Sequence, residues 1–177
     1  MGDTLDQTLL AGFVRGDQSA FESVYRHLES DVYRWILRIV RDEGAAEDVL
    51  VEAFWRAYRG RARFDSSRSF GAWMRRIATN AALDHLRTAR KHATVPATES
   101  NTPATGASDG VLHDSIAVAF GRLPPKLQVA ATLALVEEQP YAVIADALNV
   151  PIGTVKSRVF RAIRALRVEL AHLGVRP

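Results

Sequence analysis

Hydrophobic residues recur at intervals of three and four along most of the chain, which is the spacing of amphipathic helices. In the first half the pattern predicts a helix that starts after Asp17, whose side chain can cap it, and two more helices over about 42–59 and 69–90. No stretch alternates convincingly with the period of two that is typical of a strand. We therefore predict an all-α fold. The predicted core positions include Val24, Leu28, Val32, Trp35, Ile36, Val49, Leu50, Ala53, Phe54, Phe70, Met74 and Ala81.

Residues 92–108 interrupt this pattern. They are rich in Pro, Ser, Thr and Ala and contain no aromatic residue and no periodic apolar face, which is typical of a flexible linker. The linker separates a predicted helical domain over 1–91 from a second one over 109–177. In the second domain helices are predicted over about 111–121 and 126–138. The expected architecture is thus two small helical domains joined by a flexible linker.

Residues 141–173 have the layout of a helix-turn-helix: a short helix, a tight turn and a basic helix. Asn149 can take the left-handed conformation that the turn needs, and Pro151 suits the start of a helix. Apolar residues at 155, 159, 163, 166 and 170 form one buried stripe. The side chains left outside are Lys156, Ser157, Arg158, Arg161, Arg164 and Arg167. An ordinary amphipathic helix with a solvated basic face would look similar, but the turn and the preceding helix favour a DNA reader.

The net charge of +3 conceals an uneven distribution along the chain. Five acids and no base lie within residues 42–52, whereas residues 68–91 hold six Arg or Lys and one acid. A second basic segment, residues 156–167, has five bases and no acid. Two basic helical segments on either side of a neutral linker suggest two contacts with one polyanion, although solvated faces would give the same counts.

The helix over 69–90 is a second candidate for nucleic-acid binding. Arg76, Asn80, Asp84 and Arg87 share one face of it, so that cations lie beside an amide that could bond to base edges. Asp84 and Arg87 could also form a simple ion pair within the helix. The preceding loop could line a pocket with small and polar residues. Its Phe64 could stack on a base or belong to the core, and the same holds for Trp73.

The acidic helix needs a different explanation because its charge would repel DNA. Glu43, Glu47, Asp48 and Glu52 could face a basic protein partner, and they could equally form a solvated face. The two alternatives stay open on the residues alone.

Several classes of function are disfavoured by composition. The chain has no cysteine, which excludes disulfides and thiolate metal sites, and its five histidines are scattered, so neither a metal nor another cofactor is expected. No apolar run is long enough to span a membrane and the first residues are polar and acidic, so we expect a cytoplasmic protein without membrane contact. No nucleophile, base and orienting group come together, which argues against an enzyme.

Taken together, these segments resemble the extracytoplasmic-function (ECF) sigma factors of bacterial RNA polymerase, the smallest members of the sigma-70 family. The motifs similar to the family's region 2 are GDQSAFESVY (16–25), VYRWILRIVR (32–41), AEDV (46–49), RFD (63–65), Ser69-Phe70 with Ala72-Trp73, Ile77-Ala78 with Asn80, and ALDHLR (82–87). Those similar to region 4 are LPP (123–125), Tyr141, Ile144-Ala145 and residues 150–158. The order and spacing of the motifs are more specific than any one of them.

The resemblance implies a transcription initiation factor that directs core RNA polymerase to promoters and assists strand opening. It implies that the acidic helix, through Glu47, Asp48 and Glu52, binds the polymerase clamp helices. The second domain would contact the polymerase flap. An anti-sigma factor is a further partner that the resemblance allows. The residues that it places on the minus 35 duplex are Thr154, Lys156, Ser157, Arg158, Arg161 and Arg164. Those on the partly single-stranded minus 10 element are Phe64, Asp65, Ser66, Ser67, Arg76, Asn80 and Arg87.

Two positions depart from the family pattern. Val51 stands where a polar Gln is common on the polymerase-facing helix, and Ala142-Val143 replaces an acidic pair before Ile144. The main alternative to a sigma factor is a stand-alone helix-turn-helix regulator that binds duplex operators without polymerase, usually as a dimer.

Overall fold

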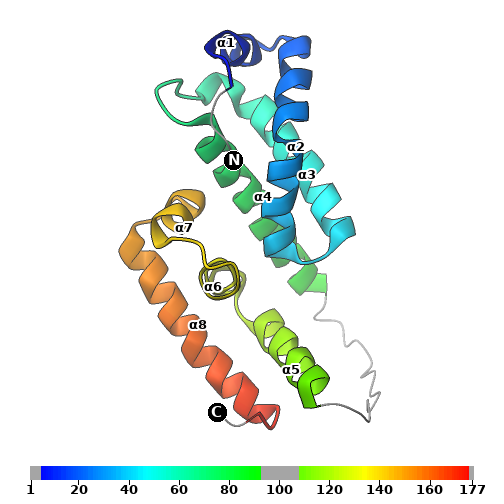
Figure 1. Ribbon diagram of the computed structural model, residues 1–177, viewed down its shortest axis with the longest axis vertical. Helices are drawn as coiled ribbons and strands as arrows, with labels where there is room; N and C mark the ends of the chain where they lie inside the picture. Colours follow the sequence, from blue (N-terminus) through cyan, green and yellow to red (C-terminus); the bar gives the residue numbers. More distant parts are fainter. Residues whose placement is uncertain (1–4, 93–107, 176–177) are drawn as a thin grey trace.

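The computed structural model describes residues 5–92 and 108–175, and every regular element in those two ranges is helical (Figure 1). The predicted all-α class is therefore confirmed over the described residues. The predicted linker, 92–108, lies outside them except for its two end residues. The elements are α1 (Gln7–Arg15), α2 (Gln18–Val40), α3 (Glu43–Gly60), a 3-10 turn (Arg61–Arg63), α4 (Phe70–His92), α5 (Ser108–Arg122), α6 (Pro125–Ala131), a π-helical turn (Thr132–Val136), α7 (Tyr141–Leu148) and α8 (Ile152–His172).

Helices α2, α3 and α4 form a bundle whose ends are set by local capping. Asp17 caps α2, as predicted, because its carboxylate accepts hydrogen bonds from the backbone N–H groups of Ser19 (2.9 Å) and Ala20 (3.4 Å). These bonds, together with one from the Ser19 hydroxyl, hold the pKa of Asp17 below its ordinary value. Asp42 caps α3 through the N–H of Ala45 at 2.7 Å. The buried residues of α3 are those that the periodicity predicts: Ala46, Val49, Leu50, Ala53, Phe54 and Ala57.

Helix α1 was not anticipated from the sequence. Asp6 caps its start, and Gly16 ends it in the left-handed conformation at φ +89°. Phe13 is 1% exposed, and its ring meets the edge of Phe70 at a centroid distance of 5.3 Å. A side chain at position 16 would also come within 2.8 Å of the Arg61 guanidinium. Gly16 thus lets α1 fold back onto the start of α4.

The second half begins with α5 and ends in the helix-turn-helix. The prediction of one helix over 126–138 was too simple: α6 ends at Ala131 and a wider π-helical turn follows. The chain then reverses at Glu138, which has φ +49°, before Pro140 precedes α7. Asn149 adopts the left-handed conformation predicted for the turn, at φ +50°. Val155, Val159 and Leu166 are buried on α8, as the stripe predicts.

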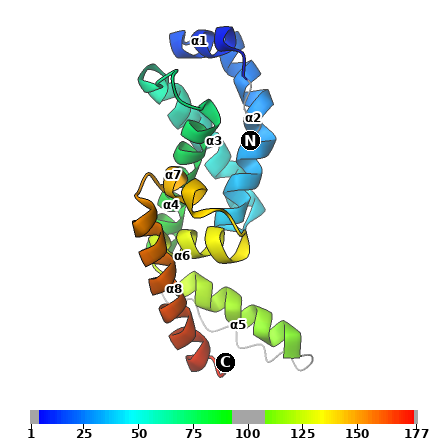
Figure 2. The same cartoon turned by 60° about the vertical axis from the view of Figure 1, so that its left-hand side comes forward.

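The two halves pack against each other across α4, which no sequence pattern indicated. Helix α4 contacts α2 and α3 in its own half and α6 and α7 in the other, and one hydrophobic cluster continues through both halves (Figures 1 and 2). Polar contacts accompany it. Arg38 on α2 forms an ion pair with Glu137 at 3.2 Å, and Arg90 donates to the carbonyl oxygens of Leu123 (2.9 Å) and Arg122 (3.3 Å).

One polar contact lies inside the bundle. The Trp35 indole Nε1 donates to the Thr79 hydroxyl at 2.9 Å, and that hydroxyl donates in turn to the carbonyl of Arg75 at 2.8 Å. Trp35 is 5% exposed and Thr79 is fully buried. The pair joins α2 to α4 in a fixed register, because a buried indole N–H without an acceptor is costly.

We expect Thr79→Val, which keeps the shape but removes the acceptor, to lower the free energy of unfolding by about 1 to 3 kcal/mol. Thr79→Ser keeps the hydroxyl and loses one methyl group, so its cost should be about 1 kcal/mol. Urea denaturation followed by tryptophan fluorescence measures both variants. A loss for Thr79→Ser with little or no loss for Thr79→Val would show that packing alone, and not the hydrogen bond, matters at this position.

Candidate nucleic-acid and protein interfaces

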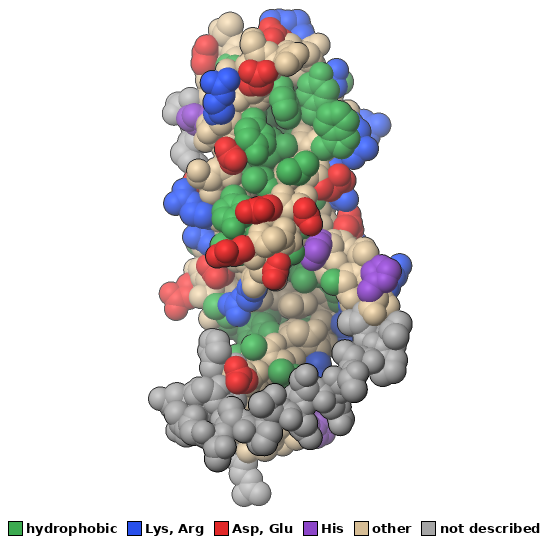
Figure 3. Space-filling model, turned by 90° about the vertical axis from the view of Figure 1, so that its right-hand side faces the viewer, with side chains coloured by type: hydrophobic (Ala, Val, Ile, Leu, Met, Phe, Trp, Pro, Cys, Tyr) green, Lys and Arg blue, Asp and Glu red, His purple; other side chains and the backbone are tan. Residues whose placement is uncertain are grey.

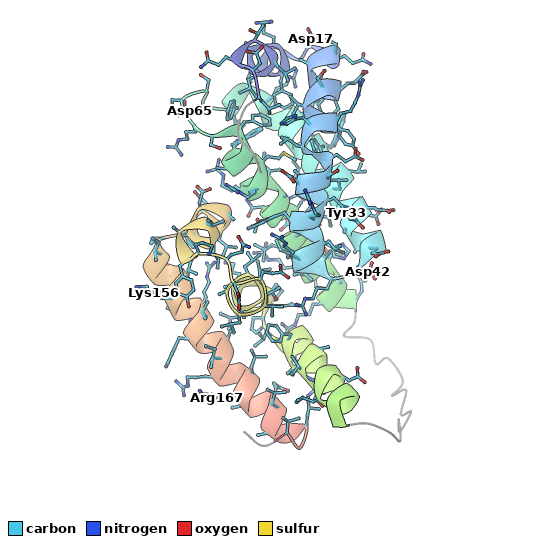
Figure 4. The ribbon with its side chains drawn as sticks, in the orientation of Figure 1. Asp17, Tyr33, Asp42, Asp65, Lys156 and Arg167 are labelled. Atoms are coloured by element: carbon cyan, nitrogen blue, oxygen red, sulfur yellow. The ribbon has the colours of Figure 1, made fainter. Side chains whose placement is uncertain are left out.

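The outer face of α8 carries most of the side chains predicted to read duplex DNA. Lys156, Ser157, Arg161 and Arg164 are exposed, and in Figure 4 Lys156 and Arg167 extend from α8 on the side away from α5. Arg161 is held along the helix, since its Nε donates to the carbonyl of Ser157 at 3.2 Å. The face therefore offers an ordered row of cations at the spacing of successive helical turns, a shape that fits a major groove.

Two members of the predicted set are less accessible. Thr154 and Arg158 are half-buried, at the side of α8 where it turns toward the core. Burial lowers the pKa of Arg158, and the nearby charge of Arg161 lowers it further. A partly buried guanidinium beside a second cation would gain from a phosphate or a base acceptor close to both.

The loop between the 3-10 turn and α4 is fixed by its own polar side chains. The carboxylate of Asp65 accepts hydrogen bonds from the hydroxyl (2.7 Å) and the N–H (3.0 Å) of Ser67, and these bonds lower the pKa of Asp65. Arg68 adds an ion pair at 3.5 Å. Asp65, Ser66 and Ser67 are exposed, so the loop presents a preformed polar edge at the start of α4.

Phe64, predicted to line a base pocket, is a core residue in this structure. It is 8% exposed, and its ring lies 5.0 Å from Phe70 and 5.1 Å from Trp73, centroid to centroid. These two rings cover one side of Phe64, and the residue also lines an open pocket of about 510 Å³ together with Ser66 and residues of α1. The sequence left two alternatives open for Phe64, and the structure favours core packing. By packing on α4, the Phe64 side chain would hold the loop that follows it in place.

The three predicted residues of α4 do not share one environment. Asn80 and Arg87 are exposed. Arg76 is half-buried, and its Nη1 donates to the side-chain oxygen of Asn149, in the turn of the helix-turn-helix, at 3.4 Å. The interface between the halves therefore occupies one predicted DNA contact and leaves the other two open.

The acidic helix forms a separate face. Glu47 and Asp48 are exposed, whereas Glu52 is paired with Arg56 at 2.7 Å. Figure 3 shows acidic side chains on this face below a patch of hydrophobic ones. Between α2 and α3 lies an open groove of about 960 Å³, lined by Tyr25, Glu29, Ser30, Tyr33, Arg34, Glu47, Leu50 and Val51.

Comparison with known proteins assigns these faces to a family. Residues 24–92 match sigma-70 region 2 and residues 113–166 match sigma-70 region 4. The ECF RNA polymerase sigma factor SigW of Bacillus subtilis is 33% identical over 174 residues, which cover 90% of this chain and 93% of the relative. The chain is an ECF sigma factor of the sigma-70 family. The ECF RNA polymerase sigma-E factor of Escherichia coli K12 is 31% identical, with 91% and 92% coverage.

Solved structures agree on the fold of the sigma factor. The structure of CnrH in complex with the cytosolic domain of CnrY superposes with a TM-score of 0.59 at 21% identity, and covers 94% of this chain and 97% of CnrH. The sigma factor RpoE of Bartonella quintana, in complex with the anti-sigma factor NepR, gives a TM-score of 0.54 at 20% identity. At such identities the likeness concerns the arrangement of helices.

Two exposed apolar side chains, Phe160 and Trp55, were not among the candidates predicted from the sequence, and a third, Val51, was named there only as a departure from the family pattern. Phe160 is 62% exposed on the basic face of α8, and Val51 (64%) and Trp55 (52%) lie one turn apart on α3. Trp55 stacks on Tyr58 with centroids 6.0 Å apart. All three positions lie outside the buried stripes, so their exposure could have been predicted from the periodicity. An aromatic or aliphatic side chain that falls off a stripe is a candidate contact residue.

Within residues 5–92 and 108–175, no helix is long and apolar enough to cross a membrane. No group of three or more His, Cys, Asp or Glu side chains among them is placed to hold a metal ion.

Proposed function

We propose that this sigma factor divides its work between opposite faces. The acidic face of α3, through Glu47, Asp48 and Glu52, binds the clamp helices of core polymerase. The basic face of α8 reads the minus 35 duplex, and the loop of Asp65 with Asn80 and Arg87 handles the minus 10 element. The observation that carries the proposal is the separation of charge: the described acids of α3 and the cations of α8 lie on different sides of the molecule (Figures 3 and 4).

The remaining assignments extend this division. We place the first unit at 1–91 and the second at 109–177, with the second also touching the polymerase flap. Thr154, Lys156, Ser157, Arg158, Arg161 and Arg164 would contact the minus 35 element, and the exposed ring of Phe160 adds an apolar surface suited to a thymine methyl group. In this role the chain acts in the cytoplasm, where the polymerase and the chromosome lie, and does no chemistry of its own. An anti-sigma factor would be a partner of the free chain.

Reconstitution with core polymerase separates a sigma factor from a stand-alone regulator. The double variant Glu47→Gln and Asp48→Asn should bind core at least tenfold more weakly, since both side chains are exposed and open to a basic partner. Asp114→Asn, which removes an exposed charge from α5, is the control and should bind normally. Core affinity is measured by fluorescence anisotropy of labelled chain. If the double variant binds core with unchanged affinity, the acidic side chains of α3 only form a solvated surface.

Substitutions on the two proposed DNA-binding surfaces should impair different steps of initiation. Arg161→Ala should cost about 1 to 3 kcal/mol in binding at the upstream element if it reads a base, with a loss that depends on the minus 35 sequence. Asn80→Ala should leave closed-complex formation intact and slow opening. Permanganate reactivity of unpaired thymines reports opening, and filter binding reports the closed complex. An equal effect of Asn80→Ala on both steps would contradict its assignment to the single strand.

The packed arrangement of the halves cannot span a promoter. About 25 base pairs separate the minus 10 and minus 35 elements, which is about 85 Å of duplex at about 3.4 Å per base pair. Helix α4 and the helix-turn-helix are neighbours here, joined through Arg76 and Asn149. We therefore infer that the halves separate before both elements are bound.

Introduced cysteines test this separation, because the chain has none of its own. Arg38→Cys with Glu137→Cys places two thiols at the ion pair between the halves. After reaction with a short bis-maleimide, the chain should lose transcription from a promoter with both elements, whereas the unreacted double variant and each single variant after the same treatment should retain it. Full activity of the cross-linked chain would show that no separation is needed.

A further inference from the structure

A row of ion pairs joins the acidic face of α3 to the exposed edge of α4. Arg56 donates from Nε to Glu52 and from Nη1 to Asp84, each at 2.7 Å. The other oxygen of Asp84 accepts a hydrogen bond from Nη1 of Arg87 at 2.8 Å. The row thus runs from a carboxylate proposed to bind polymerase to a cation proposed to bind promoter DNA, through Arg56 and Asp84.

The members of this row are able to change partners. Between a third and a half of each side chain is exposed: 33% for Arg56, 42% for Glu52, 46% for Asp84 and 45% for Arg87. Ion pairs with this much water contribute little to folding stability. A new charge beside one member would therefore be enough to shift the others.

Arg56 is shared between two carboxylates, because its Nε donates to Glu52 while its Nη1 donates to Asp84. While Glu52 takes part of the charge of Arg56, Asp84 keeps more of its negative charge for Arg87, and a guanidinium paired with a carboxylate is a poor ligand for a phosphate. If Glu52 is drawn away and Arg56 pairs with Asp84 alone, that carboxylate is more fully neutralised and its hold on Arg87 weakens. The sharing of Arg56 links the two ends of the row although Glu52 and Arg87 do not touch.

We propose that Arg56 is a positioning residue that couples polymerase binding to promoter binding. A cation of the polymerase that engages Glu52 shifts Arg56 toward Asp84, and Arg87 is released for a phosphate of the minus 10 strand. The inference rests on the proposed roles of Glu52 and Arg87. Because such coupling is reciprocal, promoter DNA at Arg87 also favours polymerase at Glu52.

The test is the lifetime of the promoter complex at saturating core polymerase, measured after a challenge with competitor DNA. Arg56→Gln leaves Asp84 with Arg87 as its remaining partner in the row, so the lifetime should fall about threefold to tenfold, within the range of ordinary coupling. Adding Asp84→Asn should restore the wild-type lifetime because it frees Arg87. The promoter complex of the triple variant, which also carries Arg87→Gln, should again have a short lifetime. Arg59→Gln is the matched control: Arg59 touches Glu52 at 3.5 Å and lies outside the contacts of Asp84 given above.

The outcomes separate the coupling from the proposed function. An unchanged lifetime for Arg56→Gln, or a short lifetime that Asp84→Asn does not restore, overturns the coupling. If Arg87→Gln alone leaves the lifetime at its wild-type value, the assignment of Arg87 to the promoter is wrong and the coupling falls with it. Circular dichroism melting curves of all variants should superpose on the wild type, and a lowered melting temperature for Arg56→Gln would identify a structural role instead.

Discussion

The rest of the structure depends on the burial of α4 on several sides at once. Ala78, Thr79, Ala81, Ala82 and Leu83 are all buried in the middle of this helix. Their small side chains let α2 and α3 approach from one direction and α7 from another, because close packing of helices is limited by side-chain size. Between Phe70 and Leu86 only Asn80 is exposed, and Arg87 is the first residue of the exposed C-terminal end of the helix. A helix surrounded in this way presents its polar edge with little freedom of orientation.

The single buried polar contact of the bundle belongs to the same helix. The Thr79 hydroxyl accepts a hydrogen bond from the Trp35 N–H and donates one to the backbone carbonyl of Arg75 in α4. Both polar groups of the pair therefore have a hydrogen-bond partner. The bond defines how far α2 lies along α4, and through α2 it defines the position of α3. The acidic face of α3 and the edge of α4 with Asn80 are therefore parts of one bundle, and their separation is fixed by packing.

Much of the fold follows from the sequence, and its failures have identifiable causes. The stripe on α3 and the turn at Asn149 were predicted because periodicity and the left-handed preference of Asn are local properties. Helix α1 was missed because nine residues between Asp6 and Gly16 give too short a pattern to stand out. The π-helical turn after Ala131 depends on the reversal before Pro140, which no residue spacing encodes.

At the candidate sites too, features set by neighbouring residues could be predicted, and features set by tertiary contacts could not. Exposure of Lys156, Arg161 and Asn80 could be predicted, since each lies opposite an apolar stripe. The burial of Phe64 was one of two alternatives that the sequence left open. The bond from Arg76 to Asn149 could not be predicted, because it joins segments that meet only in the folded chain. The ion-pair row through Arg56 is of this second kind: its central contact joins residues 28 positions apart.

Opposite charge on opposite faces also gives the molecule an electric dipole moment. A chain with acids around α3 and cations along α8 is an electric dipole, and it turns in the field of a large charged partner before the two surfaces touch. The same field that draws the acidic face toward a basic surface keeps the cations of α8 pointed outward. On the proposed roles, this orientation would bring the acidic face of α3 to the polymerase first and would leave the cations of α8 free for DNA.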